Sequence, residues 1–219
     1  MNKNLQPYFE HANGIVIGGN LSWKFNDFIK CANKTINVDV VANYPGNLVQ
    51  PDYLTDAANL YFAKDSEFNF VCSSHVLEHL ADPLKAIKEW IRVIEKNGVI
   101  YCAIPDKRFT FDHRRKRTSL KHLIGDYQNS VSPNDLTHLS DMFFNYDYKL
   151  AGMSREQVFY QVLDFYASTK NGGTIVYQPH HHVFVKDDLV SLFEYCDLKI
   201  LFAKVQGITA HILAQKQCW

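Results

Sequence analysis

Short apolar runs recur along the chain and are typical of buried strands. They are Gly14–Ile17, Thr35–Val38, Phe68–Cys72 and Val99–Ile104. Two further strand candidates, Lys199–Val205 and Thr209–Ala214, lie close enough to form an antiparallel hairpin around Gln206-Gly207. We therefore expect a sheet built from strands that are spread over almost the whole chain.

Helical patterns separate these runs. Asp82-Pro83 supplies an N-cap and a first-turn proline, and Asn97-Gly98 supplies a stop signal. Apolar residues recur between them at helical spacing, namely Leu84, Ile87, Trp90, Ile91 and Ile94. Trp23–Cys31 and Asp187–Tyr195 show similar spacing, whereas Gly46–Thr55 contains two prolines and is expected to be irregular. This alternation of strand, helix and strand predicts a mainly parallel sheet.

Residues 106–175 interrupt the alternation. They contain polar and aromatic residues without a further strand pattern until the sheet resumes near the C-terminus. We interpret residues 1–219 as a single α/β domain in which 106–175 form a helical insertion that caps the acceptor side.

Composition narrows the classes of function. Lysine plus arginine and aspartate plus glutamate both number 23, and this balance argues against a general nucleic-acid binder. No apolar run approaches the roughly 20 residues of a membrane span, so we expect no membrane insertion. Five scattered cysteines without a CxxC pair, and a start without a signal-peptide pattern, favour a cytoplasmic protein.

The segment Phe68–Pro105 carries a resemblance to a known family. It reads FNFVCSSHVLEHLADPLKAIKEWIRVIEKNGVIYCAIP. It resembles the fourth strand, following helix and fifth strand of class I S-adenosylmethionine (SAM)-dependent methyltransferases of the type 11 group. The residues in register are Ser73-Ser74-His75, Leu77-Glu78-His79, Asp82-Pro83, Trp90, Arg92-Val93 and Asn97-Gly98. The resemblance implies a Rossmann-like sheet of seven strands, mainly parallel with an antiparallel last strand, and SAM as cofactor.

It also implies where SAM would bind. A parallel sheet places its ligand at the carboxyl ends of the strands, and glycines let backbone approach that ligand. An acidic residue about 20 positions after the glycine loop meets ribose hydroxyls in nucleotide-binding folds, and Asp39 has this spacing. The expected cofactor-binding residues are Gly18, Gly19, Asn20, Asp39, Val40, Asp56, Ala57, Ser73 and Ser74.

Two positions depart from the family pattern. The family carries an acidic residue two positions before its first glycine and a second glycine two positions after it, where this chain has Val16 and Asn20. The acidic residue normally supports the methionine part of SAM. A non-catalytic relative that serves as a binding or scaffold protein is therefore the alternative hypothesis.

The stretch His75–His79 also fits a different enzyme class. It matches H-x-x-E-H, the inverted zinc-protease motif, in which two histidines bind zinc and the glutamate acts as base. That motif requires a long helix, whereas this stretch directly follows a buried strand and precedes a new helix start at Asp82. A zinc hydrolase therefore remains a remote alternative.

Basic residues cluster after the fifth strand, in PDKRFTFDHRRKR. Arginine forks recognise phosphate or carboxylate groups, and the segment begins at the rim of the predicted cleft. We expect a small anionic acceptor, contacted by Asp106, Lys107, Arg108, Arg114 and Arg115.

Histidines supply the candidate bases. The run QPHHHVF contains three of them, and histidine can accept a proton near neutral pH. We expect His75, His180 and His182 to be catalytic and no metal to be needed, although a metal pair from His180 and His182 with Asp106 or Asp112 is conceivable.

A second resemblance bears on the acceptor. The segments IPDKRFTFDHRRKRTSLKHLIGDY and HHHVF are similar to small methyltransferases of bacterial capsule and surface-polysaccharide gene clusters. It implies O-methylation of a phosphorylated, phosphoramidate or nucleotide-linked precursor of a surface polysaccharide.

Overall fold

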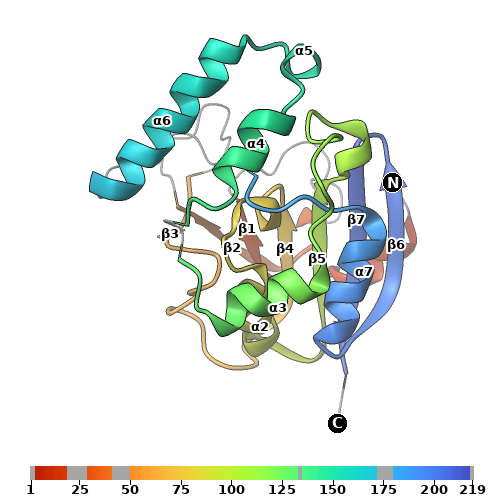
Figure 1. Cartoon of the computed structure of the whole chain (residues 1–219). Helices are drawn as coiled ribbons and strands as arrows, with labels where there is room; N and C mark the ends of the chain where they lie inside the picture. The colour runs from red at the N-terminus through yellow and green to blue at the C-terminus, as the bar shows by residue number, and fades with distance from the viewer. Residues whose placement is uncertain (1–2, 19–28, 41–49, 133–134, 172–179, 218–219) are drawn as a thin grey trace.

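A seven-stranded sheet forms the centre of the computed structural model (Figure 1). The structure describes residues 3–18, 29–40, 50–132, 135–171 and 180–217. The strands are β1 (Asn13–Ile17), β2 (Lys34–Asp39), β3 (Tyr53–Leu54), β4 (Phe68–Ser74), β5 (Ile94–Pro105), β6 (Leu198–Gln206) and β7 (Thr209–Lys216). Their order is β3-β2-β1-β4-β5-β7-β6; β7 is antiparallel to β5 and β6, and the other pairs are parallel. The predicted fold class is confirmed.

Each face of the sheet packs against a different layer. The larger apolar core joins one face to three helices, which are α2 (Pro83–Val93), α3 (Leu120–Gln128) and α7 (Lys186–Tyr195). A smaller core on the other face includes Leu5 and Phe9, in and just after the 3-10 helix η1 (Lys3–Tyr8). Most of the helix predicted over Trp23–Cys31 lies outside the described residues.

Helix α2 begins as predicted but ends earlier. The Asp82 carboxylate accepts a hydrogen bond from the Lys85 amide at 2.9 Å, and proline follows the cap. The prediction that the helix continues to Asn97-Gly98 is wrong, because Ile94 already pairs with Phe68 at the start of β5. Asn97 has a φ of 64°, so these two residues form an irregularity inside the strand rather than a helix stop.

Two residues of α2, Trp90 and Arg92, form hydrogen bonds with the chain that follows β3. The Trp90 indole is fully buried and donates a hydrogen bond to the Ala57 carbonyl at 2.9 Å. The Arg92 guanidinium donates to the carbonyls of Leu60 and Ala63. These bonds hold the segment that carries Asp56 and Ala57 in place at the sheet.

The insertion is helical, as predicted. It contains η3 (Lys107–Phe109), α3, α4 (Leu139–Asn145), α5 (Tyr148–Ala151) and α6 (Arg155–Asn171). Helix α3 packs against α2 and α7, whereas α4, α5 and α6 gather at the top of the molecule in Figure 1. Met142, Tyr146 and Val158 form a small core between α4 and α6. The role of the insertion as a cap over the acceptor stays a prediction.

In the described parts of the chain, no helix has the length and apolar character of a membrane span.

Candidate active site

The sheet reverses its order of strands between β1 and β4, and a crevice at such a switch point is where open α/β sheets bind ligands. Gly18 follows β1, and Ser73 pairs with Ile17 at the neighbouring end of β4. Gly18 has a φ of 88°, and a Cβ there would lie 2.4 Å from Val76 Cγ2. Only glycine fits this conformation and this contact. Gly19 and Asn20 lie outside the described residues.

Val16 occupies the position at which the family pattern has an acid. Its side chain is buried in the smaller apolar core, together with Phe70 and Cys72. A carboxylate in this surrounding would be desolvated without a partner. The packing of this chain therefore suits valine at that position.

The predicted ribose and adenine residues lie at the same edge of the sheet. Asp39 ends β2, and its carboxylate accepts a hydrogen bond from the Val40 amide at 2.7 Å. The Thr55 amide donates to the Asp39 carbonyl at 3.0 Å, so the chain after β3 lies beside the end of β2. Asp56 accepts from the Ala58 amide at 2.7 Å. The roles of these residues and of Ser74 toward SAM stay predictions.

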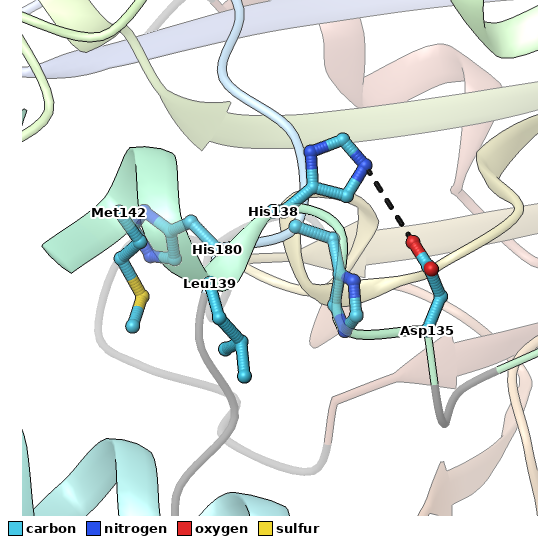
Figure 2. A pocket seen from close by; sticks show the side chains of 6 residues that line it. Asp135, His138, Leu139, Met142 and His180 are labelled. Atoms are coloured by element: carbon cyan, nitrogen blue, oxygen red, sulfur yellow. Dashed lines mark ion pairs between the residues drawn. The ribbon is translucent and has the colours of Figure 1, made fainter.

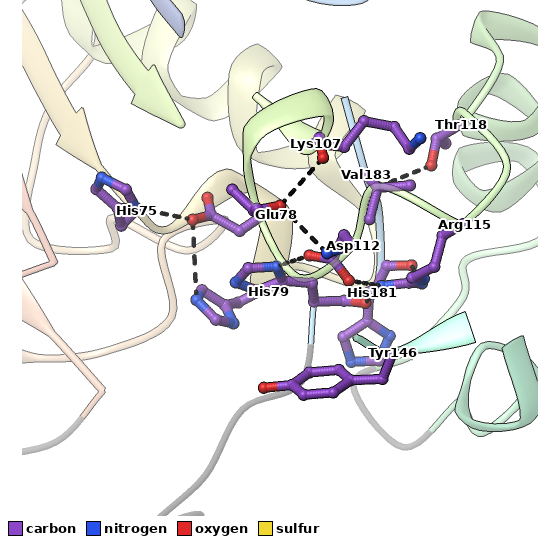
Figure 3. A network of polar contacts seen from close by, with 12 residues as sticks. His75, Glu78, His79, Lys107, Asp112, Arg115, Thr118, Tyr146, His181 and Val183 are labelled. Atoms are coloured by element: carbon purple, nitrogen blue, oxygen red, sulfur yellow. Dashed lines mark hydrogen bonds and ion pairs between the residues drawn. The ribbon is translucent and has the colours of Figure 1, made fainter. Parts of the chain in front are cut away.

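The turn after β4 places a buried carboxylate between two histidines (Figure 3). Glu78 Oε1 lies 3.4 Å from His75 Nδ1 and 3.9 Å from His79 Nε2. Burial disfavours the charged carboxylate, but the nearby His75, His79 and His180 outweigh it and hold the pKa of Glu78 below its usual value. The only regular structure between His75 and His79 is the 3-10 turn η2 (Leu77–His79), which is not the long helix that a zinc protease requires.

A carboxylate–histidine pair faces this turn. His180 Nδ1 lies 2.5 Å from Asp112 Oδ2, and the side chain of Asp112 is only 2% exposed. Burial raises the pKa of Asp112, but the hydrogen bond and charge of His180 and the charge of Arg115 outweigh it and lower the pKa. The His180 ring lies edge-on to His79, with centroids 4.8 Å apart, and stacks on Phe111.

This pair is arranged for proton transfer. A carboxylate on Nδ1 holds that nitrogen as the donor and leaves Nε2 of His180 as the acceptor, which is the orientation that general bases use. The His180 side chain retains 13% exposure, so it is not closed off from solvent. Nitrogen atoms of His79 and His180 and a Glu78 oxygen also lie within 4.8 Å of one another, close enough for a metal ion.

The other two histidines of the run are directed elsewhere. His182 is fully buried, with Nδ1 2.9 Å from the Leu80 carbonyl and Nε2 3.1 Å from Asp126 Oδ2. His180 and His182 therefore have different carboxylate partners, and Asp106 binds Arg108. The conceivable metal pair with Asp106 or Asp112 is wrong for this reason. The structure also does not bring His182 together with His75 and His180.

A narrow crevice lies next to this run (Figure 2). Its lining residues are Asp135, His138, Leu139, Met142, His180 and His181. Burial lowers the pKa of His138 to about 4 and the pKa of His181 to about 3, with help from neighbouring histidines. Both rings are therefore neutral near pH 7.

The predicted acceptor ligands all have partners within the protein. Arg108 forms a bidentate pair with Asp106, at 2.9 and 2.7 Å, and Arg114 lies 2.7 Å from Asp147. Both arginine side chains are about half exposed. The Lys107 ammonium donates to the His113 carbonyl at 2.8 Å. The substrate-binding roles of these residues stay predictions.

Arg115 differs from the rest of the basic run. Its side chain is 1% exposed, and it donates to Asp112, to Asp141 and to the carbonyls of His180 and His181. Arg115 therefore positions both members of the Asp112–His180 pair. The sequence suggested that Arg115 is an acceptor ligand. A run of arginines and lysines does not reveal which of its side chains is buried and which is exposed.

The comparisons with known proteins agree with this architecture. Residues 6–102 match the Methyltransf_11 model, which describes a methyltransferase domain. No protein of curated function matches the chain in sequence. A SAM-dependent methyltransferase from Methanosarcina mazei is 17% identical, with a TM-score of 0.55 and coverage of 100% of this chain and 99% of that one. Residues 6–102 are thus similar to a methyltransferase domain, and the chain has the fold of SAM-dependent methyltransferases.

Two further solved structures have the same fold. A putative SAM-dependent methyltransferase from Listeria monocytogenes is 12% identical, with a TM-score of 0.56 and coverage of 99% and 95%. The 1,6-didemethyltoxoflavin-N1-methyltransferase of Burkholderia thailandensis, with its substrate and S-adenosylhomocysteine bound, is 10% identical, with a TM-score of 0.54 and coverage of 99% and 78%. The predicted fold is confirmed, and the family match over residues 6–102 agrees with the predicted methyltransferase activity and SAM cofactor.

Proposed function

We propose that this methyltransferase methylates a hydroxyl oxygen of a small anionic acceptor and that the Asp112–His180 pair accepts the hydroxyl proton. The observation that carries the proposal is the 2.5 Å contact between His180 Nδ1 and Asp112 Oδ2, at the edge of the sheet where this fold binds its ligands. A neutral hydroxyl is a poor nucleophile, so a positioned base accelerates its reaction.

The residues at the sheet edge suit the cofactor. SAM supplies the methyl group together with a sulfur leaving group. Gly18 places backbone without a side chain at the carboxyl end of β1, and Asp39 and Asp56 place carboxylates where ribose and adenine would be recognised. His180 would take the acceptor's proton on Nε2, and Asp112 would stabilise the imidazolium that forms.

The acceptor class rests on the basic segment and on resemblance. Arg108 and Arg114 are half exposed, so the remaining N–H groups of each guanidinium can donate to an anionic ligand while the carboxylate partners stay in place. The similarity of Ile104–Tyr127 and His180–Phe184 to methyltransferases of surface-polysaccharide clusters supports a phosphorylated, phosphoramidate or nucleotide-linked precursor. We propose no nucleic-acid partner and a cytoplasmic location for this reaction.

Calorimetric titration with SAM and with S-adenosylhomocysteine tests the cofactor assignment. We expect saturable binding of both ligands and methyl transfer to a hydroxyl in a panel of sugar phosphates and nucleotide sugars. If neither ligand binds at millimolar concentration, the enzyme assignment is wrong. The alternative of a binding or scaffold protein, which the buried Val16 favours, then stands.

The substitution Asp39→Ala should weaken SAM binding about 10- to 100-fold, because a charge-assisted hydrogen bond to the ribose would be lost. Calorimetry measures this change directly. Asp65→Ala is the control, since Asp65 is a more exposed carboxylate that pairs with Arg92 away from the sheet edge. Unchanged affinity in Asp39→Ala would show that the ribose lies elsewhere.

The substitution Arg108→Ala should raise the KM for the acceptor about 10-fold or more and leave the SAM affinity unchanged, because one charged contact to the anion is removed. Steady-state kinetics at saturating SAM measure it. Arg117→Ala is a matched control, since Arg117 is similarly exposed and also forms a bidentate pair, with Asp188. An equal loss of acceptor use and SAM affinity would indicate a folding role for Arg108.

A further inference from the structure

Four polar side chains from three separate segments of the chain lie close together, and one of them, His182, comes from the histidine run. His122 and Asp126 are one turn apart on α3, His138 precedes α4, and His182 belongs to the histidine run. The nitrogen atoms of the three histidines lie within 4.8 Å of one another. This cluster, here called the His3Asp cluster, is separate from the Asp112–His180 pair and has no part in the proposed proton transfer.

The spacing within the His3Asp cluster fits a metal ion. His122 Nε2 lies 3.3 Å from His138 Nε2 and 3.2 Å from Asp126 Oδ2, and Asp126 Oδ2 lies 3.1 Å from His182 Nε2. Zinc binds nitrogen at 2.0–2.1 Å in tetrahedral sites, and two such ligands are therefore about 3.3 Å apart. Three of the six ligand–ligand separations agree with this value, and the three histidine nitrogens all lie within 4.8 Å of one another.

The hydrogen bond on the far side of His182 adds an independent argument. Its Nδ1 lies 2.9 Å from the Leu80 carbonyl, which can only accept, so Nδ1 carries the proton. In a neutral ring, Nε2 then presents a lone pair to the Asp126 oxygen, which is also an acceptor. Either a second proton on His182 or a metal cation between the two atoms removes this conflict. Metal-binding histidines usually donate their other nitrogen to a carbonyl or carboxylate in this way.

Two imidazoles also meet at the exposed side of the cluster. The Nε2 atoms of His122 and His138 face each other at 3.3 Å, and Asp135 lies 4.0 Å from His138. One imidazole can donate to the other in this orientation, and both can instead ligate one ion through Nε2. The negative charges of Asp126 and Asp135 favour a divalent cation.

We propose that the His3Asp cluster binds one zinc ion through His122 Nε2, Asp126 Oδ2, His138 Nε2 and His182 Nε2. The expectation from the sequence that no metal is present is thereby revised. Three imidazoles and one carboxylate are donors that zinc prefers, and four protein ligands are typical of a structural site. The side chains of His122 and His138 are 41% and 19% exposed, so the ion has a route of entry.

The ion would join the start of the insertion to the histidine run. It would connect α3, the residues before α4 and the segment that carries His180 into one unit. His182 is two residues from His180, so the ion would stabilise the position of the proposed base. This consequence rests on the proposed function, whereas the binding of zinc does not.

Metal content of the full-length chain tests the proposal. The protein is treated with a chelator, dialysed, reloaded with zinc chloride alone and measured by mass spectrometry of the metal. We expect one zinc per chain, a higher midpoint of thermal unfolding, and an X-ray absorption spectrum with about three imidazole ligands. Failure to retain zinc, together with an unchanged unfolding midpoint, would show a metal-free network of hydrogen bonds and overturn the proposal.

Variants locate the ion. His122→Gln combined with His138→Gln should abolish stoichiometric zinc binding, because two of four ligands are lost. His113→Gln is the matched control, since His113 has similar exposure and also pairs with an aspartate, Asp147. His79→Gln addresses the Glu78–His79–His180 group. Loss of zinc in His79→Gln but not in the double variant would place the ion there and overturn the proposal.

The readouts separate this proposal from the proposed function. Zinc content and X-ray absorption report on the His3Asp cluster whether or not the chain methylates anything. If the double variant does not fold, the ligand count from the absorption spectrum of the unaltered protein still decides. Three imidazoles support the His3Asp cluster, whereas two or fewer contradict it, since the Glu78–His79–His180 group supplies only two.

Discussion

Replacing His180 with glutamine should lower the rate of methyl transfer about 100- to 10,000-fold and leave SAM affinity almost unchanged. The imidazole is the group that would accept the hydroxyl proton, and glutamine preserves much of its size without a basic nitrogen. The rate is measured as release of S-adenosylhomocysteine under saturating acceptor, and the affinity by calorimetry.

Controls distinguish a base from a structural histidine. Asp112→Asn should cause a comparable loss, because an amide nitrogen can donate to Nδ1 of His180 and thereby favour the wrong tautomer. His113→Gln alters an exposed histidine that pairs with Asp147 and should change the rate little. An acceptor whose reacting oxygen is already ionised should lose little activity in His180→Gln. A loss as large for that acceptor as for a neutral hydroxyl would contradict proton transfer by His180.

Replacing Arg115 with methionine should lower the free energy of unfolding by about 3–5 kcal/mol, which is the usual cost of removing one partner from a buried ion pair. The Arg115 side chain is 1% exposed and Asp112 is 2% exposed, so water cannot compensate for the lost guanidinium. The carbonyls of His180 and His181 would also lose their donor. Urea denaturation monitored by circular dichroism measures the change.

The neighbouring arginine is the control for this effect. Arg114 is 55% exposed and pairs with Asp147 at the surface, so Arg114→Met should leave the denaturation midpoint almost unchanged. Where Arg115→Met remains folded at low temperature, its methyl-transfer rate should also fall, because Asp112 and His180 would lose their common support. Equal effects of the two substitutions on stability would contradict the assignment of Arg115 as the buried positioning residue.

Arg114 and Arg115 also show what the sequence could not reveal about the basic run. The run after β5 indicated anion recognition by several arginines. Arg115 is buried because its guanidinium pairs with Asp112, three residues earlier, and with three acceptors that other segments supply. Those three are Asp141 and the carbonyls of His180 and His181, which lie 26 to 66 residues away, and no local pattern marks them.

The sequence by itself determined the fold through local signals. The buried strand at Phe68, the N-cap at Asp82 and the apolar periodicity of α2 all act within a few residues of one another, so they are visible in the sequence alone. The prediction that Asn97-Gly98 ends a helix was wrong because it also rested on a local signal. A positive φ serves a helix end or an irregular strand equally well, and the pairing of Ile94 with Phe68 decides between them.

Only the tertiary structure decided the chemistry of the histidine run. Three consecutive histidines look equivalent in the sequence, yet His180 meets Asp112 while His182 meets Asp126. His122 and Asp126 are spaced to share a helix face, but no sequence signal placed His138 beside them. A proton acceptor or a metal site is defined by which donors and acceptors face each other across the fold, and long-range packing sets that arrangement.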